Sequence, residues 1–115
     1  MFKKQFSFEE RLIEANRVLY KYPDRVPIIV EKNINAPSDC PLIYKNKYLV
    51  PRDLTFGHLI CVIRKRLNIS PEKAIFLFIN NTIPPSCSYI NDIYNVFVSS
   101  DKFLYVTYTY ENVFG

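Results

Sequence analysis

The stretch KYLVPRDLTFGHLICVIRKRL, residues 47–67, carries the signals that decide the fold. Its first residues, 47–50, predict a strand whose successive side chains alternate between two faces, and Pro51 ends it. Thr55 then has the position of a helix N-cap. A helix is predicted after it, because apolar residues recur at helical spacing and cations in the last turn suit the helix dipole: Phe56, Leu59, Ile60, Ile63 and Leu67, with Arg64, Lys65 and Arg66.

A helix and a strand are predicted before this stretch. Ser7 and Glu10 are spaced as a capping box, which predicts a helix start at Ser7, and Pro23 ends the helical pattern. Glu14 and Val18 share a face beside the predicted apolar stripe, which consists of Phe8, Leu12, Ala15, Leu19 and Tyr22. Residues 26–32 begin with a β-branched run that predicts the first strand, and residues 33–43 have the composition of a loop. A hairpin therefore joins the first two strands.

Three further elements are predicted after residue 67. The unbroken apolar run 75–79 indicates a buried central strand, and residues 88–95 a short helical turn. Residues 103–110, rich in Tyr, Thr and Val, indicate the last strand. This order predicts an α+β β-grasp, in which one helix packs across a mixed four-stranded sheet. The predicted divisions are an N-terminal helical extension (1–24), the β-grasp domain (25–110) and a C-terminal tail (111–115).

Composition limits the class of protein. The chain has 115 residues, 49% of them hydrophobic, which is enough for one domain with its own core. Its three cysteines are too few and too widely spaced for a disulfide framework, which favours a reducing cytosol. The first residues lack the apolar region of a signal peptide, and no apolar run approaches the roughly 20 residues of a membrane span. We therefore expect a cytoplasmic protein that reaches membranes only after modification.

Charge is distributed unevenly along the chain. Residues 1–66 hold 13 Lys and Arg against 7 Asp and Glu, whereas residues 67–115 hold 2 against 4. The first half therefore presents a basic face, which could attract nucleic acid, anionic lipid or acidic peptides, or could simply be a solvated surface.

Catalytic, metal and nucleic-acid patterns are weak. His58 and Cys61 lie one helical turn apart, as a base and nucleophile could, but such a pair in an amphipathic helix usually reflects packing. A metal site would need distant Cys40 or Cys87 to converge. The last strand lacks the basic-aromatic signature of an RNA-recognition module. We expect no enzyme activity, no metal, no cofactor and no nucleic-acid partner.

Several strings together resemble the autophagy-related protein 8 family of ubiquitin-like modifiers, which includes the microtubule-associated protein light chain and the GABA-receptor-associated protein. The resemblance spans nearly the whole chain, in the right order. Its strings are residues 22–27 (YPDRVP), 47–51 (KYLVP), 53–55 (DLT), 63–66 (IRKR), 80–81 (NN), 84–85 (PP), 103–106 (FLYV) and 111–115 (ENVFG).

The resemblance implies a ubiquitin-like modifier rather than an enzyme. Its Gly115 carboxylate would be activated by an E1-like enzyme, passed to an E2-like enzyme and joined to phosphatidylethanolamine. In many relatives a cysteine protease removes residues after this glycine, and also deconjugates the product. The resemblance further implies a protein that is monomeric and cytoplasmic before conjugation, and that lies afterwards on the autophagosome or, in some lineages, a plastid membrane.

The resemblance also implies recognition of cargo receptors through a short motif, an aromatic residue followed three places later by Leu, Ile or Val. The pocket for the aromatic side chain would consist of Glu14, Val18, Pro27, Ile29, Lys47, Leu49 and Phe103. The aliphatic pocket would consist of Tyr48, Val50, Pro51, Leu54, Leu59, Val62 and Ile63. Arg25, Lys45 and Arg66, with Lys47, would pair with acidic residues that flank the motif.

Three points stay open at this level. Ile29, Leu54, Val62 and Ile63 could equally be plain core residues, and Lys47 a solvated strand lysine. The loop between the first two strands is about two residues longer than in close relatives, and Leu59 and Cys61 stand where aromatic residues are common, which could reshape the second pocket. The alternative function is an adaptor or trafficking protein that binds partner peptides without being conjugated.

Overall fold

The computed structural model describes residues 1–110 as four strands and four helices. The predicted tail 111–115, with Gly115, lies outside the described residues. In chain order the elements are α1 (Phe2–Gln5), α2 (Phe8–Lys21), β1 (Arg25–Lys32), β2 (Lys47–Pro51), α3 (Phe56–Leu67), β3 (Phe76–Phe78), α4 (Ile90–Phe97) and β4 (Leu104–Thr109). Within residues 1–110, no helix combines the length and apolar character needed to cross a membrane.

The four strands form one mixed sheet, as predicted, and their order in it is β2-β1-β4-β3. β1 pairs antiparallel with β2 and parallel with β4, and β4 pairs antiparallel with β3. β2 is therefore an edge strand. β3 is the other edge strand, so the prediction of a central strand at 75–79 is wrong. An apolar run indicates that a strand is buried on both faces, and Leu77 and Phe78 are indeed buried. It does not indicate whether the strand lies at the centre or at the edge of the sheet.

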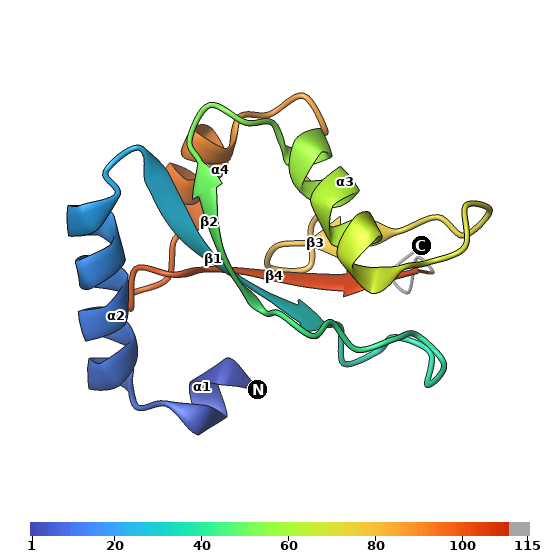
Figure 1. Ribbon diagram of the computed structural model, residues 1–115, viewed down its shortest axis with the longest axis horizontal. Coiled ribbons are helices and arrows are strands. Elements are labelled where there is room, and N and C mark those ends of the chain that lie inside the picture. Colours follow the sequence, from blue (N-terminus) through green and yellow to red (C-terminus); the bar gives the residue numbers. More distant parts are fainter. Residues whose placement is uncertain (111–115) are drawn as a thin grey trace.

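The sheet is covered on both faces (Figure 1), with α3 above it and α1 below it in that view. One core joins β1 residues Val26, Ile28 and Val30 to α3, α4 and the other strands. A second, smaller core lies on the opposite face, where Ile29 packs with Phe2, Ala15 and Phe103. Because successive side chains of a strand point to opposite faces, Ile28 belongs to the main core and its neighbour Ile29 to the small one.

Both predicted helix starts are confirmed at atomic level. The Ser7 hydroxyl accepts a hydrogen bond from the Glu10 backbone N–H (3.1 Å), and the Glu10 carboxylate accepts one from the Ser7 N–H (2.9 Å). Thr55 caps α3 in the same way, with the His58 imidazole completing the box. α3 ends at Asn68, whose left-handed backbone (φ 53°) closes the last turn.

The buried face of α2 differs from the predicted stripe. Val18 is 1% exposed and Ala15 fully buried, whereas Phe8 is 39% exposed. The buried face is thus rotated from the stripe towards Val18, while Ala15, which the stripe includes, packs with Ile29 and Phe103 in the small core. α4 is also displaced from its predicted range by two residues, beginning at Ile90.

α1 was not predicted from the sequence. Its Phe2 ring is buried and meets the Phe103 ring edge-on at a centroid distance of 5.1 Å. The Phe2 backbone N–H donates to the Glu31 carboxylate (2.7 Å), which ties the helix to β1. Phe2 and Phe6, four residues apart, were the available signal, but a single helical turn has too little periodicity to stand out.

Candidate peptide-binding surface

The register of β1 and β2 divides the predicted site residues between the two faces of the sheet. Leu49 lies opposite Pro27 and Lys47 opposite Ile29, on the α2 side. The intervening residues, Tyr48 and Val50, belong to the α3 side, where they join the main core. The predicted aromatic pocket and most of the predicted aliphatic pocket therefore lie on opposite sides of one edge strand.

The residues predicted for the aromatic pocket lie on α2, β1 and β2, with Phe103 just before β4. Ile29 and Phe103 share the small core, and Val18 and Pro27 are also buried. The other three, Glu14, Lys47 and Leu49, are half-buried. The group therefore has an apolar floor and a polar rim.

An ion pair joins α2 to β2 at the rim of the predicted aromatic pocket. The Lys47 ammonium donates to the Glu14 carboxylate at 2.5 Å, and the Arg17 guanidinium donates to both carboxylate oxygens at 2.7 and 3.0 Å. The hydrogen bond from Arg17 is the main cause that lowers the pKa of Glu14 from 4.5 to about 2; Lys47 also lowers it, and desolvation opposes the shift. Lys47 is thus not simply a solvated strand lysine.

This ion pair makes a pH-dependent contribution to stability. A carboxyl whose pKa is lowered by folding stabilises the protein above its unfolded pKa, and the stabilisation is lost as the pH falls from about 4.5 towards 2. Because both partners are partly exposed, we expect less than about 1 kcal/mol. Urea unfolding should show wild type more stable than Glu14→Gln at pH 7 and equal to it near pH 2. A gap for Glu14→Gln that is the same at both pH values would contradict the assignment.

A hollow of about 260 Å³ adjoins the aromatic pocket and includes residues that sequence reasoning missed. Arg11 is the main addition. Its Nε lies 3.5 Å from the buried Asp101 carboxylate, and Nε and Nη1 have no hydrogen-bond partner among residues 1–110. The hollow is lined by Phe2, Phe6, Glu10, Arg11, Glu14 and Lys47.

The residues predicted for the aliphatic pocket divide into core and surface. Tyr48, Val50, Leu59 and Ile63 belong to the main core and are at most 6% exposed, so they can offer a ligand only a floor. Leu54 and Pro51 are half-buried, and Val62 is 39% exposed. Pro51 lies opposite Arg25 in the register, so its position places it on the face of Leu49 rather than with Tyr48.

The three residues predicted for the electrostatic rim are exposed at different points around this edge strand. The Lys45 ammonium lies 5.3 Å from the centre of the Tyr48 ring, and the Arg25 guanidinium 5.9 Å from that of Tyr22. Arg66 lies in the last turn of α3. Burial raises the pKa of Tyr48, and Arg66 opposes the shift. The Tyr48 hydroxyl has no hydrogen-bond partner within the described residues.

The His58 side chain has a structural role at the start of α3. Its Nδ1 lies 2.9 Å from the Thr55 hydroxyl and 3.2 Å from the Thr55 backbone N, which donates to it. These contacts complete the helix cap, and Cys61 is exposed one turn later. The geometry therefore favours a helix-capping role for His58 over a role as the base of a His58–Cys61 catalytic pair.

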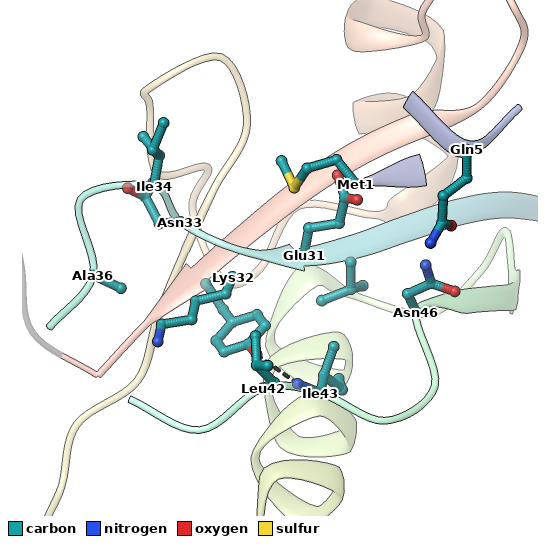
Figure 2. A pocket seen from close by; sticks show the side chains of 12 residues that line it. Met1, Gln5, Glu31, Lys32, Asn33, Ile34, Ala36, Leu42, Ile43 and Asn46 are labelled. Carbon is teal, nitrogen blue, oxygen red and sulfur yellow. Dashed lines mark hydrogen bonds between the residues drawn. The ribbon is translucent and has the colours of Figure 1, made fainter. Parts of the chain in front are cut away.

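A separate cavity of about 560 Å³ lies beside the loop that connects β1 to β2 (Figure 2). Met1 and Gln5 approach from α1, and Leu42 and Asn46 from the loop, with Glu31 between them. Neither of the two predicted peptide pockets contributes a residue to its lining. It is therefore distinct from the predicted surface.

The mixed sheet with α3 across one face is that of a ubiquitin-like β-grasp protein, with a helical extension on the other face. A family model described as "Autophagy protein Atg8 ubiquitin like" matches residues 10–115. The chain belongs to this family and is a ubiquitin-like autophagy protein.

Relatives at about half identity span nearly the whole chain. Autophagy-related protein 8h of Arabidopsis thaliana is 51% identical, over 99% of this chain and 94% of that protein. Autophagy-related protein 8 of Schizosaccharomyces pombe is 53% identical, over 99% and 93%. The family assignment therefore does not depend on one segment.

Two solved structures have the same fold. The crystal structure of Trypanosoma brucei ATG8 superimposes with a TM-score of 0.88 at 40% identity, over 94% of this chain and 91% of that one. Plasmodium falciparum Atg8 in complex with a Plasmodium falciparum Atg3 peptide also gives a TM-score of 0.88, at 30% identity over 96% of both chains.

Proposed function

We propose that this protein is a conjugated modifier that recruits partners through peptides added to β2. The observation that supports it most directly is the free edge of β2, where Lys47 and Leu49 lie beside the apolar floor of Ile29 and Phe103. The complex of the Plasmodium falciparum relative with a peptide supports peptide binding as a property of this fold.

In the proposed complex the peptide extends β2 as an added strand, so that backbone hydrogen bonds contribute affinity and alternate side chains contribute specificity. The aromatic side chain of the peptide enters between α2 and β2. It either breaks the Lys47–Glu14 ion pair or passes beside it. An aliphatic side chain rests on the exposed part of Leu54 and Val62. Burying each anchor contributes about 1.5 to 3 kcal/mol before ordering is counted, and Arg25, Lys45 and Arg66 attract flanking acidic residues.

Conjugation would proceed through the Gly115 carboxylate. Its oxygen attacks the α-phosphorus of ATP, which forms an acyl adenylate and releases pyrophosphate. An E1-like cysteine thiolate displaces AMP, and an E2-like thiolate then displaces the first thiol. The amine of phosphatidylethanolamine attacks the thioester, the thiolate leaves and the amine loses a proton, which leaves an amide. The catalytic groups belong to those enzymes, so this protein itself is not an enzyme.

The lipid product explains how a chain of this kind would act on a membrane. Phosphatidylethanolamine carries two acyl chains, and two chains anchor stably where one is marginal. We propose a cytoplasmic unconjugated form and an autophagosomal conjugated form, with a cysteine protease that reverses the conjugation. The competing function is an adaptor that binds peptides and is never conjugated.

NMR titration tests the peptide surface. A ¹⁵N-labelled sample is titrated with a peptide that contains Trp-x-x-Leu after acidic residues, and with the same peptide with both anchors changed to Ala. We expect the largest shifts at residues 47–51 and on α2, and none with the control peptide. Shifts confined to the loop that connects β1 to β2, around Leu42 and Asn46, would contradict the proposed surface.

A further inference from the structure

The first residue after β4, Tyr110, is held by side chains from two distant segments of the chain. The ladder between β3 and β4 ends at Thr109, which lies opposite Phe76. Tyr110 follows it and is nevertheless only 7% exposed. Its hydroxyl donates a hydrogen bond to the Asp39 carboxylate, 71 residues away in the chain.

The Tyr110 ring is also contacted by a cation, Lys73, from the segment that follows α3. The Lys73 ammonium lies 4.5 Å from the centre of the Tyr110 ring, a geometry that attracts a cation to an aromatic face. Lys73 is itself tied to α3, because its carbonyl accepts a hydrogen bond from the Arg64 guanidinium (2.7 Å). The Tyr110 ring is therefore held by the β1–β2 loop and by the segment that follows α3. These residues lie around a hollow of about 310 Å³ that also includes Leu67.

Charge stabilises the arrangement. The hydrogen bond from Tyr110 is the main cause that lowers the pKa of Asp39, and Lys73 and Lys32 also lower it. At neutral pH the carboxylate is thus an ionised acceptor, and hydrogen bonds to ionised groups are stronger than neutral ones. In Figure 1 the end of β4 lies beside the end of α3, and Tyr110 and Leu67 line the same hollow.

We propose that Asp39 and Lys73 are positioning residues, which hold Tyr110 and so set the point and direction in which the segment leading to Gly115 leaves the domain. The inference rests on the proposed conjugation. Five residues, 111–115, follow the anchor, and a fully extended chain of five residues spans at most roughly 17 Å. Any enzyme that takes the Gly115 carboxylate must therefore approach within that distance of Tyr110. An anchored start reduces the orientations that the reacting group can adopt, and misplacement by even one ångström can be costly to a reaction rate.

The test measures discharge of the preformed E2-like thioester onto vesicles of phosphatidylethanolamine and phosphatidylcholine in a single turnover. We expect Tyr110→Phe and Asp39→Ala each to lower the rate constant by roughly three- to tenfold. The double variant should be no slower than the slower single variant, because both changes remove one contact. Lys73→Met should also slow discharge, and Lys73→Arg should restore it, since arginine keeps the cation.

Tyr108→Phe is the matched control. The Tyr108 hydroxyl also binds the β1–β2 loop, donating to the Pro41 carbonyl and accepting from the Ile43 N–H, both at 2.7 Å. It lies within β4, however, so its loss should lower thermal stability without releasing Tyr110. An unchanged discharge rate for Tyr110→Phe, or an equal loss for Tyr108→Phe, would overturn the inference. If Gly115→Ala reacts like wild type, the conjugation proposal itself fails, which is a different result.

Discussion

Replacing Gly115 by alanine should abolish conjugation to phosphatidylethanolamine while folding and peptide binding stay intact. Glycine carries no Cβ, so its carboxylate can approach catalytic groups in a channel that a side chain would obstruct. The added methyl lies on the carbon next to the reacting carbonyl, where a small displacement has a large effect on rate. We expect a loss of at least about a hundredfold in conjugate formed, measured by mass spectrometry after incubation with the E1-like and E2-like enzymes, ATP and vesicles.

The control for this experiment is Val113→Ala, a similarly small change two residues earlier. That variant should be conjugated at close to the wild-type rate and should have the same melting temperature as Gly115→Ala. If Gly115→Ala still acquires the lipid mass, conjugation through this carboxylate is wrong. Mass spectrometry of the C-terminus in cells, before and after lipid extraction, distinguishes a modifier from an adaptor that is never conjugated.

Replacing Leu49 by alanine should weaken binding of an aromatic-x-x-aliphatic peptide by roughly thirtyfold or more, as expected for an anchor at the centre of an interface. Leu49 is half-buried on the α2 side of β2, opposite Pro27. Tyr48 is less suitable for the experiment, because it is 6% exposed and belongs to the main core, so its loss would damage the fold. Calorimetric titration at a temperature well below unfolding measures the effect.

Leu42→Ala makes the same chemical change on the same hairpin and should leave the affinity unchanged, since Leu42 is 80% exposed and lies in the loop that connects β1 to β2. Conjugation should be largely retained in both variants. Equal affinities for Leu49→Ala and wild type would show that the aromatic pocket is not where the peptide binds. A loss as large in Leu42→Ala would move the site towards the cavity in Figure 2.

The sequence predicted some features of the candidate site and missed others. The alternation of Lys47, Tyr48, Leu49 and Val50 predicted two faces of a strand, and the register confirms them. The assignment of each residue to a pocket came from family resemblance and stays a prediction. Sequence spacing could not find Arg11 or Phe2 beside the entrance, because their positions depend on how α1 and α2 pack on the sheet.

Local signals by themselves determined the helix starts at Ser7 and Thr55 and the end of β2 at Pro51. Caps and proline act within a few residues, so their effect can be read from a short stretch. The apolar content of 75–79 likewise predicted burial correctly.

Only the tertiary structure decided the order of the strands, the rotation of α2 and the anchoring of Tyr110. β3 is an edge strand because β4 pairs with β1, and the face of α2 that carries Ala15 and Val18 is buried because α2 packs on β1. Asp39 meets Tyr110 across 71 residues through the folding of the β1–β2 loop. These features arise from contacts distant in the chain, whose partners no local periodicity specifies.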